Sequence, residues 1–166
     1  MIRFAVREGI ATLTICRPQV KNALDRRTME EMGRAIGLAE HNQDLRALIL
    51  TGVGRDAFIS GGDLRQFQDL ETDREVREML LVMHRLLKRI ENLPVPVIAA
   101  INGYAIGGGT EVTLACDFRI AAEEACFVFR QVDMGLITAW GGGQRLQRLV
   151  GPARARSLLL LGQTIS

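Results

Sequence analysis

Apolar residues along the chain follow two different patterns, and each pattern predicts a different kind of element. Short runs of apolar and β-branched residues bounded by glycine, proline or asparagine predict buried strands, and the two runs around Glu8-Gly9 predict a hairpin. Apolar residues that recur every three or four positions predict helices with one apolar face. The runs that predict strands lie at 2–7, 10–16, 46–51, 95–101, 117–121 and 126–130.

Helical spacing occupies the stretches between these runs. Asp25 is a suitable N-cap for a helix that continues to about His41, and a loop over 52–62 leads to a second, acidic helix start at Asp63. Strands that alternate with helices indicate an α/β fold with mostly parallel pairing. The other helices are expected at 74–92, with one apolar stripe of Val76, Leu80, Met83, Leu87 and Ile90, and at 109–116 and 144–161.

Length and composition describe an ordinary globular protein and exclude several classes. The 166 residues predict one domain, 1–166, and the net charge of +2 gives no general field for nucleic acid. No apolar run approaches the roughly 20 residues needed to span a bilayer, and the amino terminus is a strand pattern rather than a signal peptide. Three cysteines without framework spacing indicate reduced thiols. We therefore expect a cytoplasmic protein without a metal site.

The most informative segment is a glycine turn between a strand and a helix. The run 95–101 ends in an Asn-Gly turn, and Gly107-Gly108-Gly109 then leads into a helix that carries Glu111. The first amides of a helix have no intrahelical partner, so such a turn can hold an anion or a carbonyl oxygen that gains charge. The plainer alternative is a tight connection, with Glu111 as a favourable partner of the helix dipole.

A second glycine turn repeats this arrangement. Gly61-Gly62 follows the loop from Gly52 and precedes an acidic helix start at Asp63. Two peptide N–H groups, one from each turn, can converge on one oxygen, as in sites that stabilise an oxyanion. With Glu111 as an acid or base beside them, the pattern predicts carbonyl chemistry.

Four segments of the chain form a further pattern: Cys16–Asp25, Ala57–Leu64, Asn102–Ile120 and Met134–Leu146. Taken together and in this order, they resemble the crotonase (enoyl-CoA hydratase/isomerase) superfamily over essentially the whole chain. The resemblance implies a spiral of ββα units, an acyl-CoA thioester as ligand, no cofactor apart from the coenzyme A of the substrate, and a homotrimer or a pair of trimers. Full-length members continue past the position of Ser166 into further helices, so we expect a carboxy-terminal helical segment to be missing.

The resemblance also implies roles for individual residues. The backbone amides that polarise the thioester carbonyl belong to Gly62 and Gly108. Substrate contacts are implied at Asp63, Leu64 and Arg65, and contacts near coenzyme A at Asn22, Ala23 and Leu24.

The acid/base residues depart from the pattern of the superfamily. Some hydratases of the superfamily use two glutamates. In this chain Glu111 occupies the position of one of them, and Gln131 occupies the position of the other. An amide cannot exchange a proton near neutral pH, although Gln131 can orient a water molecule or a substrate group. Asp133 is a nearby carboxylate that would share the face of Gln131 in a strand. Ala139 stands where some isomerases and a dehalogenase hold an aspartate, which disfavours those two reactions.

Trp140 occupies a position that is small in most hydratases. It is either a core or trimer-interface residue or part of the substrate pocket. Together with the segment 105–119 it resembles the branch that decarboxylates ethylmalonyl- and methylmalonyl-CoA, where a neutral Gln131 would suit a substrate carboxylate. Three functions follow: a hydratase/isomerase with Glu111 as a single acid/base, such a decarboxylase, and a non-catalytic acyl-CoA-binding member.

Overall fold

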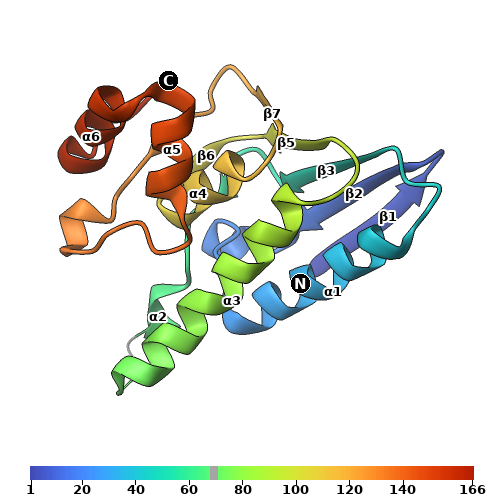
Figure 1. Ribbon diagram of the computed structural model, residues 1–166, viewed down its shortest axis with the longest axis horizontal. Helices are drawn as coiled ribbons and strands as arrows, with labels where there is room; N and C mark the ends of the chain where they lie inside the picture. The colour runs from blue at the N-terminus through green and yellow to red at the C-terminus, as the bar shows by residue number, and fades with distance from the viewer. Residues whose placement is uncertain (68–70) are drawn as a thin grey trace.

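The computed structural model describes residues 1–67 and 71–166. A five-stranded sheet has the order β1-β2-β3-β5-β7, in which β1 and β2 form an antiparallel hairpin and the other neighbours are parallel. Helices α1 (Arg26–His41) and α3 (Asp73–Glu91) pack side by side along this sheet (Figure 1). The strands are β1 (Ile2–Arg7), β2 (Ile10–Ile15), β3 (Ala47–Gly52), β5 (Val97–Ile101) and β7 (Phe118–Ala121).

A second, parallel sheet of three short strands, β4 (Ala57–Ile59), β6 (Tyr104–Ile106) and β8 (Phe127–Val128), lies beside the first. Each of these strands directly follows a strand of the larger sheet, and α2 (Leu64–Phe67) and α4 (Gly108–Leu114) follow β4 and β6. The repeat of two strands and a helix confirms the predicted spiral of ββα units. The remaining helices are the 3₁₀ turns Pro18–Val20 and Val132–Met134, α5 (Gly142–Val150) and α6 (Pro152–Leu161).

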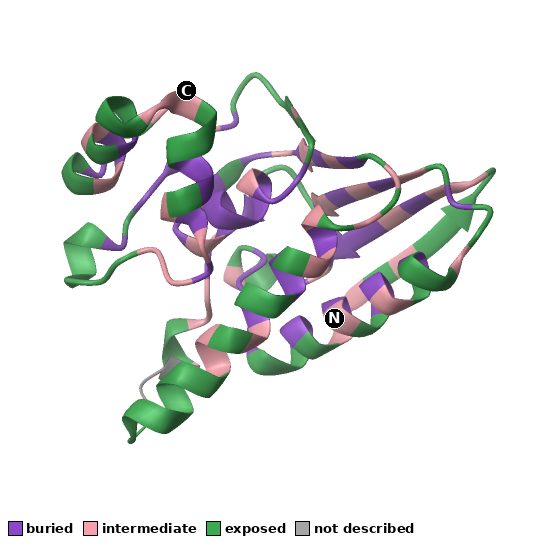
Figure 2. Cartoon of the chain, in the orientation of Figure 1, coloured by how far each residue is buried: buried purple, intermediate pink, exposed green. Residues whose placement is uncertain are grey.

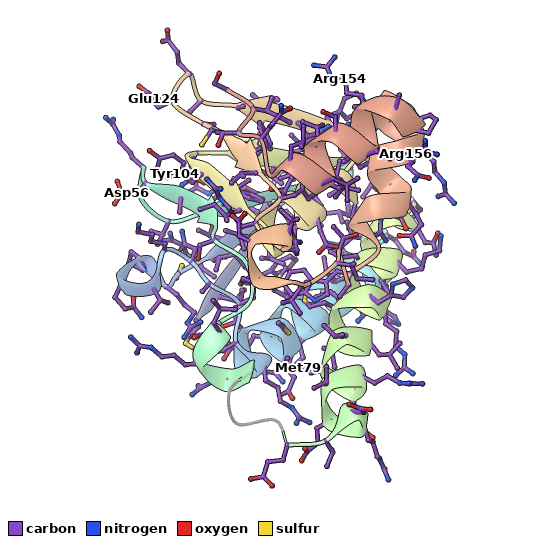
Figure 3. All side chains as sticks on the ribbon, turned by 90° about the vertical axis from the view of Figure 1, so that its left-hand side faces the viewer. Asp56, Met79, Tyr104, Glu124, Arg154 and Arg156 are labelled. Atoms are coloured by element: carbon purple, nitrogen blue, oxygen red, sulfur yellow. The ribbon has the colours of Figure 1, made fainter. Side chains whose placement is uncertain are left out.

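The turns that lead into β4 and β6 lie together at one side of the molecule. Asp56 and Tyr104 are neighbours there (Figure 3), and the backbone N–H of Tyr104 donates to the carbonyl of Asp56 at 3.0 Å. A methyl group placed on Gly103 would overlap the backbone of this same turn, so only glycine allows the close approach. Because the two strands start from one point, their carboxyl ends also finish together.

Local signals in the sequence explain where the long helices begin. The Asp25 carboxylate accepts a hydrogen bond from the Thr28 N–H at 2.7 Å, which confirms the predicted N-cap of α1. Helix α3 begins at a capping box between Thr72 and Glu75. No helix in the described part of the chain is long and apolar enough to cross a membrane.

The core lies between the larger sheet and the helices α1 and α3, and it continues to α4, which is almost wholly buried (Figure 2). The predicted stripe of α3 is buried only in its carboxy-terminal part, at Met83, Leu87 and Ile90. Val76 is exposed because the amino-terminal half of α3 extends past the sheet (Figures 1 and 2).

Three sequence expectations about the elements are wrong. The loop 52–62 contains β4, and β6 was not predicted, because strands of three residues are too short to show a period. The expected helix 144–161 is two helices, since Gly151 ends α5 and Pro152 begins α6. The expected strand 126–130 is confined to β8, so Gln131 lies outside it and is the N-cap of the 3₁₀ turn Val132–Met134.

Candidate active site

Two glycine turns meet at one cavity of about 430 Å³. Gly61-Gly62 follows β4, and Gly107-Gly108 joins β6 to α4, so the turns extend from neighbouring parallel strands. A methyl group placed on Gly61 would lie 3.5 Å from the backbone nitrogen of Gly108. The turns are therefore in contact, and residues of both line the cavity.

Each turn leaves one backbone amide free. In the first turn, Leu24 N–H donates to the Gly61 carbonyl at 2.8 Å, and Asp63 N–H donates to the Leu24 carbonyl at 2.9 Å. Successive amides of an extended chain point in opposite directions, so the Gly62 N–H points away from Leu24. In the second turn, Gly108 is the first residue of α4 and has no acceptor within the helix. Within the described residues, neither N–H has a hydrogen-bond acceptor.

Glu111 supplies a buried carboxylate to the same cavity. It lies in α4 and is only 2% exposed. Its Oε2 accepts hydrogen bonds from the backbone N–H groups of Trp140 (2.9 Å) and Gly142 (2.8 Å), and its Oε1 accepts one from Gln131 Nε2 (3.0 Å). Burial raises the pKa of Glu111, and these hydrogen bonds offset only part of that rise. A carboxyl group with a raised pKa is suited to exchange protons.

Beside the two free amides and the Glu111 carboxylate, Gln131 adds a hydrogen-bond acceptor that has no partner in the described chain. The residue is 8% exposed and lines the cavity. The Cδ of its side-chain amide would lie 3.8 Å from a methyl group placed on Gly107. Because its Nε2 donates to Glu111, its Oε1 is left buried with no partner among the residues that the structure describes. A buried acceptor of this kind is costly unless a ligand or water donates to it.

Trp140 is both a core residue and a wall of the cavity. A methyl group on Gly108 would overlap the six-membered ring of its indole. The carbonyl of Trp140 accepts a hydrogen bond from Arg145 at 2.7 Å, and Arg145 forms a two-bond ion pair with Glu91 of α3 (2.9 and 3.0 Å). These contacts hold the segment that carries Trp140 against α4.

The segment 22–24 meets the cavity at one residue only. Ala23 lines it, but the Asn22 side chain is buried and bonds the carbonyls of Val53 (3.0 Å) and Ala57 (2.8 Å). Leu24 is fully buried in the core. The side chains of Asn22 and Leu24 therefore hold the fold rather than face a ligand. The three residues after Gly62 all line the cavity: Asp63, Leu64 and Arg65.

Asp133, which the sequence suggested as a possible pocket residue, does not line this cavity. Gln131 is the N-cap of the 3₁₀ turn Val132–Met134, so residues two positions apart do not share a face as they would in a strand. Asp133 is exposed and pairs with Arg130 at 3.0 Å, while Gln131 is buried.

Sequence reasoning missed several residues of the cavity wall. Leu80 comes from α3, and no motif indicates that this helix reaches the site. The others lie within the recognised segments or, for Arg130, between two of them, but no role in the cavity wall was assigned to them: Val20, Ser60, Ile106, Arg130, Met134, Leu136 and Ile137. Across residues 1–67 and 71–166, no three His, Cys, Asp or Glu side chains gather as a metal site.

The fold and this site define a family. The model of the enoyl-CoA hydratase/isomerase family matches residues 5–166, and the chain belongs to that family. A short-chain-enoyl-CoA hydratase of Clostridium acetobutylicum is 41% identical over 160 residues, and a crotonyl-CoA hydratase of Syntrophomonas wolfei is 40% identical over 159 residues. Each alignment covers 96% of this chain and 61% of the relative, so the chain spans less than two thirds of these relatives.

Solved structures agree with these relatives. The crystal structure of an enoyl-CoA hydratase from Bacillus anthracis has a TM-score of 0.94 at 37% identity, over 99% of this chain and 64% of that one. An enoyl-CoA hydratase from Polaromonas sp. JS666 has a TM-score of 0.93 at 34% identity, over 99% of this chain and 65% of that one.

Proposed function

We propose that the protein is an enoyl-CoA hydratase that adds water to a short-chain 2-enoyl-CoA thioester, with no cofactor apart from the coenzyme A of its substrate. One observation carries the proposal: a buried carboxylate, Glu111, shares a cavity with two free amides, those of Gly62 and Gly108. The named activities of the relatives from Clostridium acetobutylicum and Syntrophomonas wolfei support this substrate class.

The amides would act on the thioester carbonyl. When water attacks C3 of the enoyl group, the electrons of the C2–C3 double bond move into an enolate, whose negative charge develops on the carbonyl oxygen. Two donors that are already in place stabilise that charge without reorganisation, and removal of one such donor typically costs about 2.7–4 kcal/mol of barrier.

Glu111 would carry the proton in both directions. As the oxygen of water bonds to C3, its proton passes to Oε1 of ionised Glu111, and the carboxyl group then delivers a proton to C2. One water molecule is added and Glu111 returns to its ionised form. Oε2 is occupied by the N–H groups of Trp140 and Gly142, so Oε1 is the oxygen that exchanges the proton.

Gln131 would position the attacking water. Its Oε1 lacks a partner, and the Nε2 of the same amide donates to the oxygen of Glu111 that exchanges the proton. A water molecule that donates one hydrogen to each of these oxygens is held for attack. In this arrangement the neutral amide of Gln131 orients the water, as the second glutamate would in hydratases that use two. Glu111 alone transfers the proton.

A second function, decarboxylation of a substrate such as ethylmalonyl-CoA, is favoured by the charge of the site. Gln131 is neutral, and burial raises the pKa of Glu111, which makes its uncharged form more accessible beside a substrate carboxylate than an exposed glutamate would be. The amides of Gly62 and Gly108 would stabilise the same enolate. A non-catalytic acyl-CoA-binding role is the third alternative.

Parallel assays of the intact protein with crotonyl-CoA and with ethylmalonyl-CoA test these alternatives. Loss of the enoyl absorption and formation of 3-hydroxybutyryl-CoA support the hydratase. Release of CO₂ from ethylmalonyl-CoA without hydration supports the decarboxylase. Acyl-CoA binding without turnover of either compound leaves the non-catalytic role.

We also propose that the protein assembles as a trimer or a pair of trimers. Exposed apolar side chains support association, because soluble proteins rarely leave large apolar patches open to water. Such side chains occur on β7, at Phe118 and Ile120, and at the end of α6, at Leu160 and Leu161. Light scattering of the intact protein measures the number of subunits, and a monomer would contradict the proposal.

A further inference from the structure

A buried arginine lies behind the first glycine turn. Arg17 is 8% exposed, and its Nη2 lies 3.1 Å from Asp25 Oδ2 and 3.0 Å from Asp63 Oδ2. Its Nη1 donates to the carbonyl of Ala23. One guanidinium group therefore joins the N-cap of α1, the segment that carries Ala23 and the residue that follows Gly62.

The backbone strengthens the same connection. Leu24 bonds both residues that flank Gly62, through Leu24 N–H to Gly61 and through Asp63 N–H to Leu24. Arg17 contacts both partners of this connection. Its Nη1 donates to the carbonyl of Ala23, which precedes Leu24, and its Nη2 donates to the carboxylate of Asp63. The direction of the Gly62 N–H thus depends on groups that Arg17 holds.

Charge gives a second reason for this arrangement. Asp63 lines the cavity next to Gly62, so it carries a negative charge close to the region where the negative charge of the enolate would develop. Two like charges in a site of low polarity repel each other strongly. The guanidinium group draws the Asp63 carboxylate to its own side and offsets its charge.

We infer that Arg17, through Asp63, is a positioning residue that sets the direction and strength of the Gly62 amide as an oxyanion donor. The inference rests on the proposed function, because it assumes that a thioester carbonyl binds between Gly62 and Gly108. A purely structural role would also explain the ion pairs, so the test must measure polarisation of the carbonyl and not stability alone.

A chromophoric thioester, 4-(dimethylamino)cinnamoyl-CoA, reports that polarisation directly, since its absorption moves to longer wavelength when donors pull on the carbonyl oxygen. The intact protein and the variants Asp63→Asn and Arg17→Lys would each be titrated with it. Turnover of crotonyl-CoA and the melting temperature would be measured alongside. The matched control is Glu40→Gln, which makes the same carboxylate-to-amide change in a two-bond pair with Arg89 (2.8 and 2.7 Å) that is not part of the cavity wall.

We expect both cavity variants to lose most of the shift to longer wavelength and to lower kcat up to about 10²-fold, because a misplaced donor has an effect of this size. KM should change little. Glu40→Gln should keep the full shift and the full kcat even where its melting temperature falls.

The inference is overturned if the unchanged protein shows the shift and both variants retain it with normal kcat. If Arg17→Lys does not fold, Asp63→Asn alone decides the question, because it preserves the shape of the side chain. If the unchanged protein binds the probe without any shift, the proposed oxyanion site itself is wrong, and the role of Arg17 is rejected with it.

Discussion

The six-membered ring of the Trp140 indole lies directly against the Cα of Gly108. The residue that closes one side of the cavity is thus in contact with one of its two free amides. The same Trp140 donates its backbone N–H to Glu111 at 2.9 Å. Changes at Gly108, Trp140 and Glu111 should consequently affect one another.

Replacement of Gly108 by alanine should impair both folding and catalysis. The added methyl group would overlap the indole of Trp140, and excess volume of this kind typically costs about 1–3 kcal/mol of stability. We expect turnover to fall by about 10²–10³-fold because the amide is displaced. The control is Gly33→Ala in α1, where the methyl group would meet only Arg89 at 3.7 Å. Equal effects of the two changes on turnover would contradict the role of Gly108.

Replacement of Trp140 by phenylalanine should change which acyl chains are accepted. The smaller ring leaves space beside Gly108, so the ratio of kcat/KM for a longer enoyl-CoA to that for crotonyl-CoA should rise. One methylene group is worth about 10–200-fold in discrimination, and we expect a rise of at least about 10-fold. Trp140→Phe should also relieve part of the loss caused by Gly108→Ala. An unchanged ratio would assign Trp140 to the core alone.

Replacement of Glu111 by glutamine should preserve the fold and reduce turnover. The amide oxygen can still accept the N–H groups of Trp140 and Gly142, and its new N–H₂ can donate to Oε1 of a rotated Gln131. Melting temperature and binding of acyl-CoA should therefore be nearly normal, while kcat falls by about 10²–10⁴-fold. A normal kcat would exclude Glu111 as the acid/base and favour the decarboxylase.

The raised pKa of Glu111 predicts opposite effects of pH on activity and stability. Hydration requires the ionised carboxylate, so kcat/KM should rise with pH through a pKa above the ordinary glutamate value of about 4.3. A raised native pKa means that the folded state holds this proton more tightly than the unfolded state. Its contribution to the free energy of unfolding is full below the unfolded pKa and is lost as pH rises through the native pKa.

The difference between the protein and Glu111→Gln isolates this contribution. Other carboxylates such as Glu40 and Glu91 have lowered pKa values because arginines donate to them, and their contributions are lost in the opposite direction, as pH falls. Denaturant unfolding at several pH values should show the stability of Glu111→Gln gaining on that of the unchanged protein as pH rises. A constant difference would show that Glu111 does not titrate in this range.

Replacement of Gln131 by methionine should move the pH profile and slow hydration. The hydrogen bond from Gln131 lowers the pKa of Glu111, so its loss should shift the rising limb of kcat/KM to higher pH. The loss of Oε1 should also reduce kcat by about 10²-fold, since the water is no longer oriented. If neither the limb nor kcat moves, Gln131 takes no part in the reaction.

Features that depend on neighbours along the chain could be predicted from the order of the residues. Gly61 and Gly107 have φ values of +111° and +54°, which glycine adopts without strain, so their turns were visible as glycine pairs. The N-cap at Asp25 and the strand–turn–helix order around Glu111 were visible for the same reason. Local chemistry was enough to mark the two glycine turns and Glu111, and the resemblance to the crotonase superfamily then pointed to the amides of Gly62 and Gly108.

Features that depend on contacts between distant segments became visible in the folded chain alone. The short strands β4 and β6 exist because they pair with each other, and that pairing brings Gly62 and Gly108 together. Asp133 turns outward and Gln131 inward because a 3₁₀ turn replaces the expected strand. Arg17 joins Asp63 across 46 positions, and Leu80 reaches the cavity from a separate helix. Such contacts leave no period or motif in the sequence, because packing in three dimensions alone brings these side chains together.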